Sequence, residues 1–191
     1  MSLETTAPTG PAIQPKRPDW AFLFRHPAHW IALGGGSGLS RWAPGTAGTL
    51  WGWAVFVLLD HLLEPSVRNL FWSLMLVLGL GVGWWACTVT ARATRIADPG
   101  FIVWDEVLAI WAVLWLVSPA SWGLQLLAFA LFRYFDAAKP GPVRWADQVF
   151  KGEGWRGGFG ILFDDLVAAG CTLLTLAALV RAAAWFGWGL V

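Results

Sequence analysis

Residues 105–136, DEVLAIWAVLWLVSPASWGLQLLAFALFRYFD, decide how this chain folds. An apolar run from Val107 to Phe132 lies between the acidic pair Asp105-Glu106 and Asp136. The run is long enough to cross a bilayer once, but Ser118-Pro119-Ala120-Ser121 interrupts it where a helix would end. If the chain turns there, the acidic residues at the two ends meet. If it does not, they lie on opposite sides of a membrane.

The distribution of basic residues favours the turn. Cytoplasmic loops of membrane proteins carry an excess of Lys and Arg. With a turn at Pro119, all of the 13 basic residues except Arg68 and Arg181 fall on one side of the predicted membrane segments. A single long span removes that bias. The first helix of the hairpin would rise only about 21 Å at about 1.5 Å per residue, so the hairpin either crosses a thinned bilayer or re-enters on the same side.

The composition is typical of a membrane protein. The chain has 191 residues, of which 57% are hydrophobic and 13% charged, and its mean hydropathy is +0.58. Soluble domains carry about 25% charged residues. The formal net charge of +1 argues against nucleic-acid binding, which needs a strongly basic surface. With further apolar segments at 49–63, 69–90 and 166–185, we predict an all-α, polytopic integral membrane helical bundle of about five membrane segments.

The chain divides into two predicted parts. Residues 1–30 are expected to form a disordered or interfacial N-terminal tail, because they lack a signal-peptide pattern and residues 20–30 mix Phe and Trp with Arg25 and His26. Residues 31–191 are expected to form a single membrane domain. Within it, a Gly-rich link at 152–160 precedes the last span, and a stripe of small residues predicts close helix packing. The stripe consists of Gly79, Gly81, Gly83 and Ala86.

Carboxylates lie at the edges of the apolar segments in three places. They belong to Asp105, Glu106, Asp136, Asp164 and Asp165. Charged groups beside hydrocarbon are costly and mark functional sites. A helix cap explains one acid of each pair, but both pairs carry two, which favours a metal site. No His lies near these residues, and Mg²⁺ prefers oxygen ligands, so we predict Mg²⁺ rather than zinc.

Residues 37–49, SGLSRWAPGTAGT, are a candidate phosphate-binding loop. Unpaired amides at a helix N-terminus attract anions, and Gly45, Thr46 and Thr49 would allow close approach and offer hydroxyls. A Thr N-cap explains the same residues as well. Arg133 and Lys139 each lie three residues from Asp136. Simple salt bridges account for that spacing, and so does a site in which both cations hold phosphate oxygens beside a metal.

Together these motifs resemble the bacterial phosphatidylglycerophosphatase A family. The resemblance spans roughly residues 30–170 and is carried by SGL and PGTAGTL at 37–50, DPGFIVWDEV at 98–107, FRYFDAAKPGPVRWAD at 132–147 and GGFGILFDDLVAAG at 157–170. It implies a Mg²⁺-dependent enzyme of the bacterial inner membrane, with its site on the cytoplasmic side. It further implies that the enzyme converts phosphatidylglycerophosphate to phosphatidylglycerol. The residues that match the family's acidic motifs are Asp105, Glu106, Asp136, Asp164 and Asp165.

We therefore expect in-line attack of water on a phosphomonoester, with Asp105, Asp136 and Asp165 as the catalytic carboxylates. An aspartyl-phosphate intermediate is the competing mechanism. Two other functions stay open: a phosphatase for another lipid phosphate, such as polyprenyl phosphate, and a small polytopic transporter. The clustering of acids at one face disfavours the transporter. The expected partners are the lipid substrate and the membrane. Asp60 and His61 receive no role, and the oligomeric state is not predicted.

Overall fold

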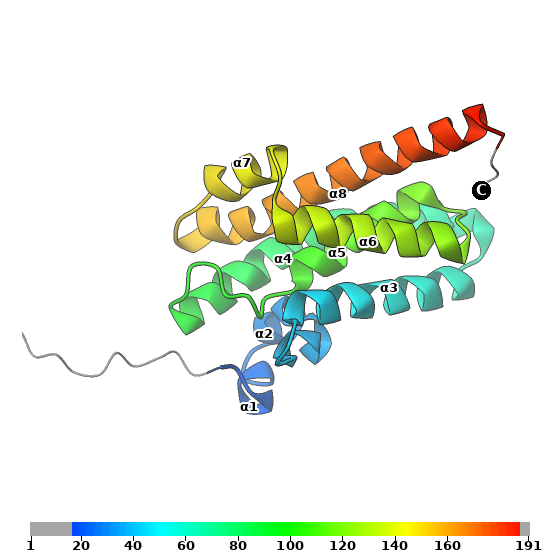
Figure 1. The fold of residues 1–191 in the computed structure, drawn as a ribbon. Coiled ribbons are helices and arrows are strands. Elements are labelled where there is room, and N and C mark those ends of the chain that lie inside the picture. Colours follow the sequence, from blue (N-terminus) through cyan, green and yellow to red (C-terminus); the bar gives the residue numbers. More distant parts are fainter. Residues whose placement is uncertain (1–16, 188–191) are drawn as a thin grey trace, which may run out of the picture.

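The computed structural model describes residues 17–187, which form helices and contain no strand. Two short helices, α1 (Trp20–Leu23) and α2 (Pro27–Ala32), and the 3₁₀ segment η1 (Gly34–Leu39) come first (Figure 1). The remaining helices are α3 (Pro44–Leu62), α4 (Pro65–Thr94), α5 (Trp104–Val117), α6 (Trp122–Ala138), α7 (Pro142–Val149) and α8 (Gly154–Trp185). The predicted all-α fold is confirmed.

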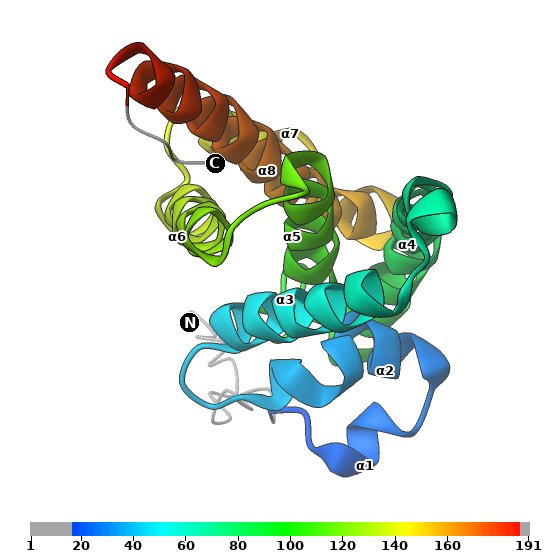
Figure 2. The ribbon, with the colours of Figure 1, turned by 90° about the vertical axis from the view of Figure 1, so that its right-hand side faces the viewer.

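Helix α5 lies at the centre of the molecule, with α3, α4, α6 and α8 around it (Figure 2). Its middle, from Val107 to Trp111, is buried on every side. Two indoles tie it to its neighbours, because Trp104 Nε1 donates to Gly79 O at 2.9 Å and Trp111 Nε1 donates to Gly52 O at 2.8 Å. The first turn of α5, which carries Asp105 and Glu106, is therefore held in place by packing against other helices.

The predicted hairpin is confirmed as a turn between two helices. Helix α5 ends at Val117, and α6 begins at Trp122 after Ser121, whose hydroxyl oxygen accepts a hydrogen bond from Leu124 N at 3.3 Å. Pro119 lies in the break, as expected from the restricted backbone around proline. A single continuous helix across this stretch is excluded. The start of α5 and the end of α6 consequently lie at the same end of the molecule (Figure 1).

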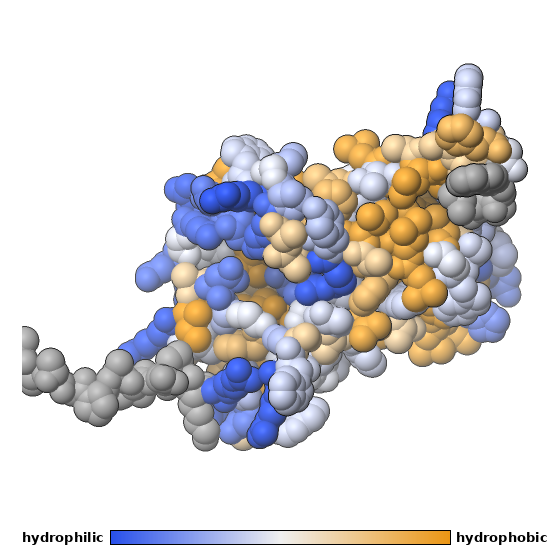
Figure 3. All heavy atoms as spheres, in the orientation of Figure 1, coloured by the Kyte–Doolittle hydropathy of each residue, from blue (hydrophilic) through white to orange (hydrophobic). Residues whose placement is uncertain are grey.

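On the face shown in Figure 3, hydrophobic side chains gather over one half and most hydrophilic side chains lie toward the other end. Helices α4 and α8 are each long and apolar enough to cross a membrane, and only 28% of each apolar window is buried within the protein. Leu74 and Val77 on α4 and Leu174 on α8 are among their exposed apolar residues. This surface is compatible with membrane association. The five-segment topology stays a prediction.

The N-terminal helices pack against the protein. Leu23, Ala28 and Ala32 are buried in an apolar cluster that also includes residues of α4. His29 Nδ1 lies 3.0 Å from Thr90 Oγ1 on α4. Ala32 O also accepts a hydrogen bond from Val103 N at 2.9 Å, which fixes the chain just before α5. The predicted boundary at residue 30 falls within α2. Residues 1–16 of the predicted tail lie outside the described residues.

The Gly-rich stretch 152–160 was predicted to be a link, but α8 already begins at Gly154. Close helix packing explains the difference. A Cβ on Gly158 would clash with Thr88 of α4, and one on Gly160 would lie 2.9 Å from Phe150 O. These glycines thus allow α4 and α7 to approach α8 closely.

Two of the three glycines in the predicted small-residue stripe on α4 pack against α5. A Cβ on Gly79 would lie 2.8 Å from Leu108, and one on Gly83 would clash with the Trp104 ring. A Cβ on Gly81 would meet no atom within 4 Å. Gly79 and Gly83, but not Gly81, permit the α4–α5 contact.

Asp60 lies near the C-terminal end of α3, where its carboxylate contacts two residues of α4. Its Oδ1 accepts from Trp72 Nε1 at 3.0 Å and lies 3.3 Å from Arg68 Nε. These contacts join the end of α3 to the start of α4. His61 is exposed beside them.

Candidate active site

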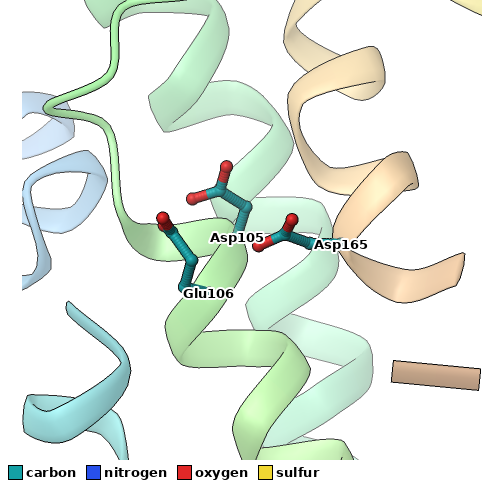
Figure 4. A group of neighbouring side chains, drawn as sticks. All are labelled: Asp105, Glu106 and Asp165. Atoms are coloured by element: carbon teal, nitrogen blue, oxygen red, sulfur yellow. The ribbon is translucent and has the colours of Figure 1, made fainter. Parts of the chain in front are cut away.

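Three carboxylates from two helices converge beside the centre of the molecule. Asp105 and Glu106 come from the first turn of α5, and Asp165 comes from the middle of α8 (Figure 4). One oxygen from each lies within 4.8 Å of the other two. We call these three residues the acid group. Asp105 Oδ1, Glu106 Oε2 and Asp165 Oδ2 are buried and have no hydrogen-bond partner within the described part of the chain.

Neither acidic pair caps a helix, so the capping alternative is wrong. The N-cap of α5 is Val103, and its side chain makes no capping bond. Asp164 and Asp165 lie well inside α8, which begins at Gly154. A buried carboxylate oxygen without a partner costs about 1–3 kcal/mol or more. Three neighbouring carboxylates that each bury such an atom would be stabilised by a bound cation.

Asp136 lies next to the acid group, where its charge acts on both Glu106 and Asp165. Arg133, one turn earlier on α6, forms an ion pair with Asp136 Oδ2. The same guanidinium lies 3.7 Å from Glu106 Oε1 and donates to Thr49 Oγ1 at 3.3 Å. Arg133 therefore joins α3, α5 and α6 at the edge of the acid group.

The first turn of α3 borders the same place. Helix α3 begins at Pro44, not at Thr49, and its N-cap is Ala43, so the Thr N-cap alternative is wrong. A Cβ on Gly45 would clash with Glu106 Oε1 and lie 3.1 Å from Arg133 Nη2. Thr49 donates to Gly45 O at 2.8 Å, and Thr46 is half-buried in the same turn. The helix end, with its unpaired amides, thus lies beside Arg133.

Lys139 and Asp164 belong to a neighbouring ion-pair network. Lys139 Nζ lies 2.5 Å from Asp164 Oδ2 and 2.5 Å from Asp147 Oδ1, and Lys151 Nζ lies 2.7 Å from Asp147 Oδ2. Adjacent residues of a helix point about 100° apart, which is why Asp165 joins the acid group while Asp164 turns to Lys139. The structure therefore separates the two acids that the sequence presented as one pair.

Charges in this network shift the pKa values of its members outside the long helices. Burial opposes the charge of Lys139, but its hydrogen bonds to Asp147 and Asp164 outweigh burial and raise the pKa of the ammonium. Burial opposes the charge of Asp147 too, yet Lys139 and Lys151 lower the pKa of its carboxyl group. All these contacts favour the charged forms.

Asp147 is a residue that sequence reasoning missed. It stands at the end of the motif 132–147, eight residues after Lys139 and beyond the turn at Pro140-Gly141. A pair separated by a turn has no helical spacing that would reveal it. The only available signal was its position within that motif.

Comparison with known proteins shows the family to which the chain is similar. The family model described as phosphatidylglycerophosphatase A matches residues 30–180. A Haemophilus influenzae phosphatidylglycerophosphatase A is 40% identical over 144 residues, covering 75% of this chain and 83% of that protein. The Escherichia coli protein of the same name is 36% identical over 143 residues, covering 75% and 77%.

A third relative carries a different name. A Bacteroides thetaiotaomicron protein, provisionally named a phosphatidylinositol-3-phosphatase, is 34% identical over 149 residues, covering 77% of this chain and 89% of that protein. No solved structure matches the chain significantly. The fold and site, with these relatives, define an enzyme of the phosphatase class, a hydrolase of phosphate esters. The chain belongs to the phosphatidylglycerophosphatase A family.

Proposed function

We propose that this enzyme hydrolyses phosphatidylglycerophosphate to phosphatidylglycerol and inorganic phosphate, in a reaction that requires Mg²⁺. The observation that carries the proposal is the acid group. Each of its three carboxylates brings one oxygen within 4.8 Å of the other two, and each buries an oxygen that has no hydrogen-bond partner in the described residues. Two nearby cations could hold a phosphate. Arg133 lies 3.7 Å from Glu106 of the acid group, and Lys139 is paired with Asp164, the chain neighbour of Asp165. The names of the two phosphatidylglycerophosphatase A relatives supply the substrate.

The residues present suit Mg²⁺. Asp105, Glu106 and Asp165 offer hard oxygen ligands, and Asp136 stands beside them as a fourth carboxylate. Asp164 would join only by leaving Lys139. A bound Mg²⁺ supplies charge neutralisation of the phosphomonoester and lowers the pKa of a coordinated water.

The remaining groups hold the substrate phosphate. Arg133, beside Glu106, and Lys139, beside Asp164, provide N–H donors. The first turn of α3 adds the amides of Gly45 and Thr46 and the Thr46 hydroxyl. The Thr49 hydroxyl would join them only by leaving Gly45 O. Water forms a bond to phosphorus as the bond from phosphorus to the glycerol oxygen breaks, in line with it. One of Asp105, Asp136 and Asp165 accepts the proton from the water, and the glycerol oxygen gains one as it leaves.

The membrane setting follows from the substrate. Its acyl chains cannot leave the bilayer cheaply, at about 0.8 kcal/mol for each buried CH₂. We propose that α3, α4, the α5–α6 hairpin and α8 form five membrane segments of the bacterial inner membrane. The positive-inside rule then puts the polar end of Figure 3 and the site in the cytoplasm.

Phosphate release from micellar substrate by the purified enzyme tests the proposal. We expect release from phosphatidylglycerophosphate in Mg²⁺, loss of release in EDTA, and recovery when Mg²⁺ is added back. Polyprenyl phosphate and phosphatidylinositol 3-phosphate should compete poorly. Faster hydrolysis of either competitor would reassign the substrate, and release that persists in EDTA would contradict the role of the metal.

The same preparation separates two chemical routes. With direct hydrolysis, ¹⁸O from water appears in the released phosphate and acid quenching traps no phosphate on the protein. A trapped acyl phosphate on Asp105, Asp136 or Asp165 would instead show an aspartyl-phosphate intermediate. A transporter without hydrolytic activity would release no phosphate at all.

A further inference from the structure

Lys139 uses two of its three donors inside the protein. An ammonium group has three N–H donors and no acceptor. Two of them bind Asp147 and Asp164, each at 2.5 Å. One donor is left for another acceptor, and the side chain is only about one third exposed. The two carboxylates thus aim the third donor of Lys139.

The backbone of Lys139 indicates that its side chain is needed there. Lys139 is the C-cap of α6 and adopts a left-handed conformation, with φ 43° and ψ 54°. Glycine is the usual residue at such a helix end, because a side chain is disfavoured in that conformation. A lysine at this position puts an ammonium group beside Asp164, the chain neighbour of Asp165 in the acid group.

Asp147 is placed to hold that ammonium. It lies on α7, which packs against α8 through Val143, Ala146 and the Trp145–Phe163 ring contact. One Asp147 oxygen binds Lys139 and the other binds Lys151. With both oxygens engaged by cations, Asp147 is not a candidate metal ligand. Its distinctive contact with the site runs through Lys139.

We infer that Asp147 is a positioning residue, which orients Lys139 so that its third donor binds an oxygen of the substrate phosphate. The inference rests on one part of the proposed function, namely that the site binds a phosphate group. It assigns the last turn of α7 a part in substrate binding. It also gives Asp164 a role: this carboxylate supplies the second contact that fixes the ammonium.

A double-mutant cycle on phosphate binding tests this inference. The dissociation constant of inorganic phosphate is measured calorimetrically, with Mg²⁺ present, for the wild type, Lys139→Met, Asp147→Asn and the double variant. We expect each single change to weaken binding about 10-fold, and the double variant to bind no more weakly than Lys139→Met alone, as for residues that act through one contact. Asp147→Glu should restore part of the loss.

Lys151→Met is the matched control, because it removes the other cation on Asp147 and leaves the Lys139 contact. It should change phosphate binding less than 2-fold, an order-of-magnitude expectation for an exposed pair. Asp147→Asn binding like the wild type would overturn the inference. So would an equal loss in the Lys139→Met background, or a wild type that binds no phosphate.

The cycle separates this inference from the proposed function. Phosphate binding needs no turnover, so the cycle holds whichever lipid phosphate is hydrolysed. If Asp147→Asn does not fold, Asp147→Ser, which also removes the charge, replaces it in the same cycle. A coupling with Lys139 would then support the inference, and additive losses would overturn it.

Discussion

The carboxylates of the proposed active site lower the stability of the protein. Asp105, Glu106 and Asp165 each bury an oxygen that no donor satisfies in the described structure. Such atoms cost about 1–3 kcal/mol each. Clusters that break a stability rule in this way mark functional sites.

Removing one of these charges should therefore separate activity from stability. We expect Asp165→Asn or Asp105→Asn to lower phosphate release about 10³-fold or more, because metal stabilisation is worth several kcal/mol. The melting temperature in metal-free buffer should stay the same or rise. Phosphate assays and thermal unfolding in detergent measure the two effects.

Glu64→Gln is the control for that pair of changes, since Glu64 is exposed at the opposite end of the molecule, before α4. Its phosphate release should match that of the wild type. Near-normal release by either aspartate variant would remove that carboxylate from the proposed metal ligands.

Gly45 is a second position where a small change, the addition of one Cβ atom, should affect activity. A Cβ there would clash with Glu106 Oε1 and crowd Arg133 Nη2 at 3.1 Å. Gly45→Ala should reduce kcat/KM by about 10- to 100-fold, since small misplacements at a site are costly. The helix itself should not suffer, because alanine favours helix by about 1 kcal/mol over glycine.

Gly123→Ala provides the comparison for Gly45→Ala. Gly123 lies in the first turn of α6, and a Cβ there would come no closer than 4.0 Å to the nearest contact, Ser121 Oγ. Its kcat/KM should equal that of the wild type. If the two alanine variants have the same activity, Gly45 has no special role.

At the scale of elements, α5 is the helix on which the site depends. Its first turn carries two of the acids, and the Trp104 ring before them packs on Gly83 of α4. Packing of this kind determines where Asp105 lies. Tertiary contacts, not a capping bond, therefore hold the start of α5.

A matched pair of glycines on α4 tests that dependence. Gly83→Ala should destabilise the protein by about 1–3 kcal/mol, because a Cβ clashes with Trp104. It should also lower activity, since Trp104 adjoins Asp105. Gly81→Ala should be neutral or stabilising by up to about 1 kcal/mol, because its Cβ meets no atom within 4 Å. Thermal unfolding with an activity assay compares them, and equal melting temperatures would contradict the proposed α4–α5 contact.

At the scale of the whole molecule, the face shown in Figure 3 has a polar end, where the candidate site lies, and a broad apolar area beyond it. The two ends of α3 illustrate this polarity, with Gly45 at the site and Asp60 paired to Arg68 and Trp72 far from it. This division is compatible with an enzyme that associates with a membrane.

Labelling of single cysteines tests which side the polar end occupies. Trp145→Cys on α7 and Leu62→Cys at the far end of α3 replace side chains that are 60% and 69% exposed. In a background with Cys171 replaced by Ser, and with Cys87 fully buried, an impermeant maleimide should label position 62 in intact cells and position 145 only after permeabilisation. Labelling of position 145 from outside would reverse the proposed orientation.

Local patterns in the sequence were sufficient for much of this structure. Pro119 and the distribution of basic residues predicted the hairpin, and apolar segments predicted the long helices, because backbone restriction and transfer free energy act locally. The five acidic candidates were visible for the same reason, since charge beside an apolar run is unusual anywhere in a chain. The Gly-rich stretch 152–160 was misjudged, because glycine favours a loop locally but here serves contacts with Thr88 and Phe150.

By itself, the sequence determined that the chain is helical, where it turns at Pro119, and which carboxylates and cations border its apolar segments. Only the tertiary structure decided that Asp165 joins Asp105 and Glu106 while Asp164 binds Lys139, and that Asp147 completes that contact. The reason is physical. The rotation of a helix about its axis, and the pairing of side chains across a turn, depend on packing between segments far apart in the chain.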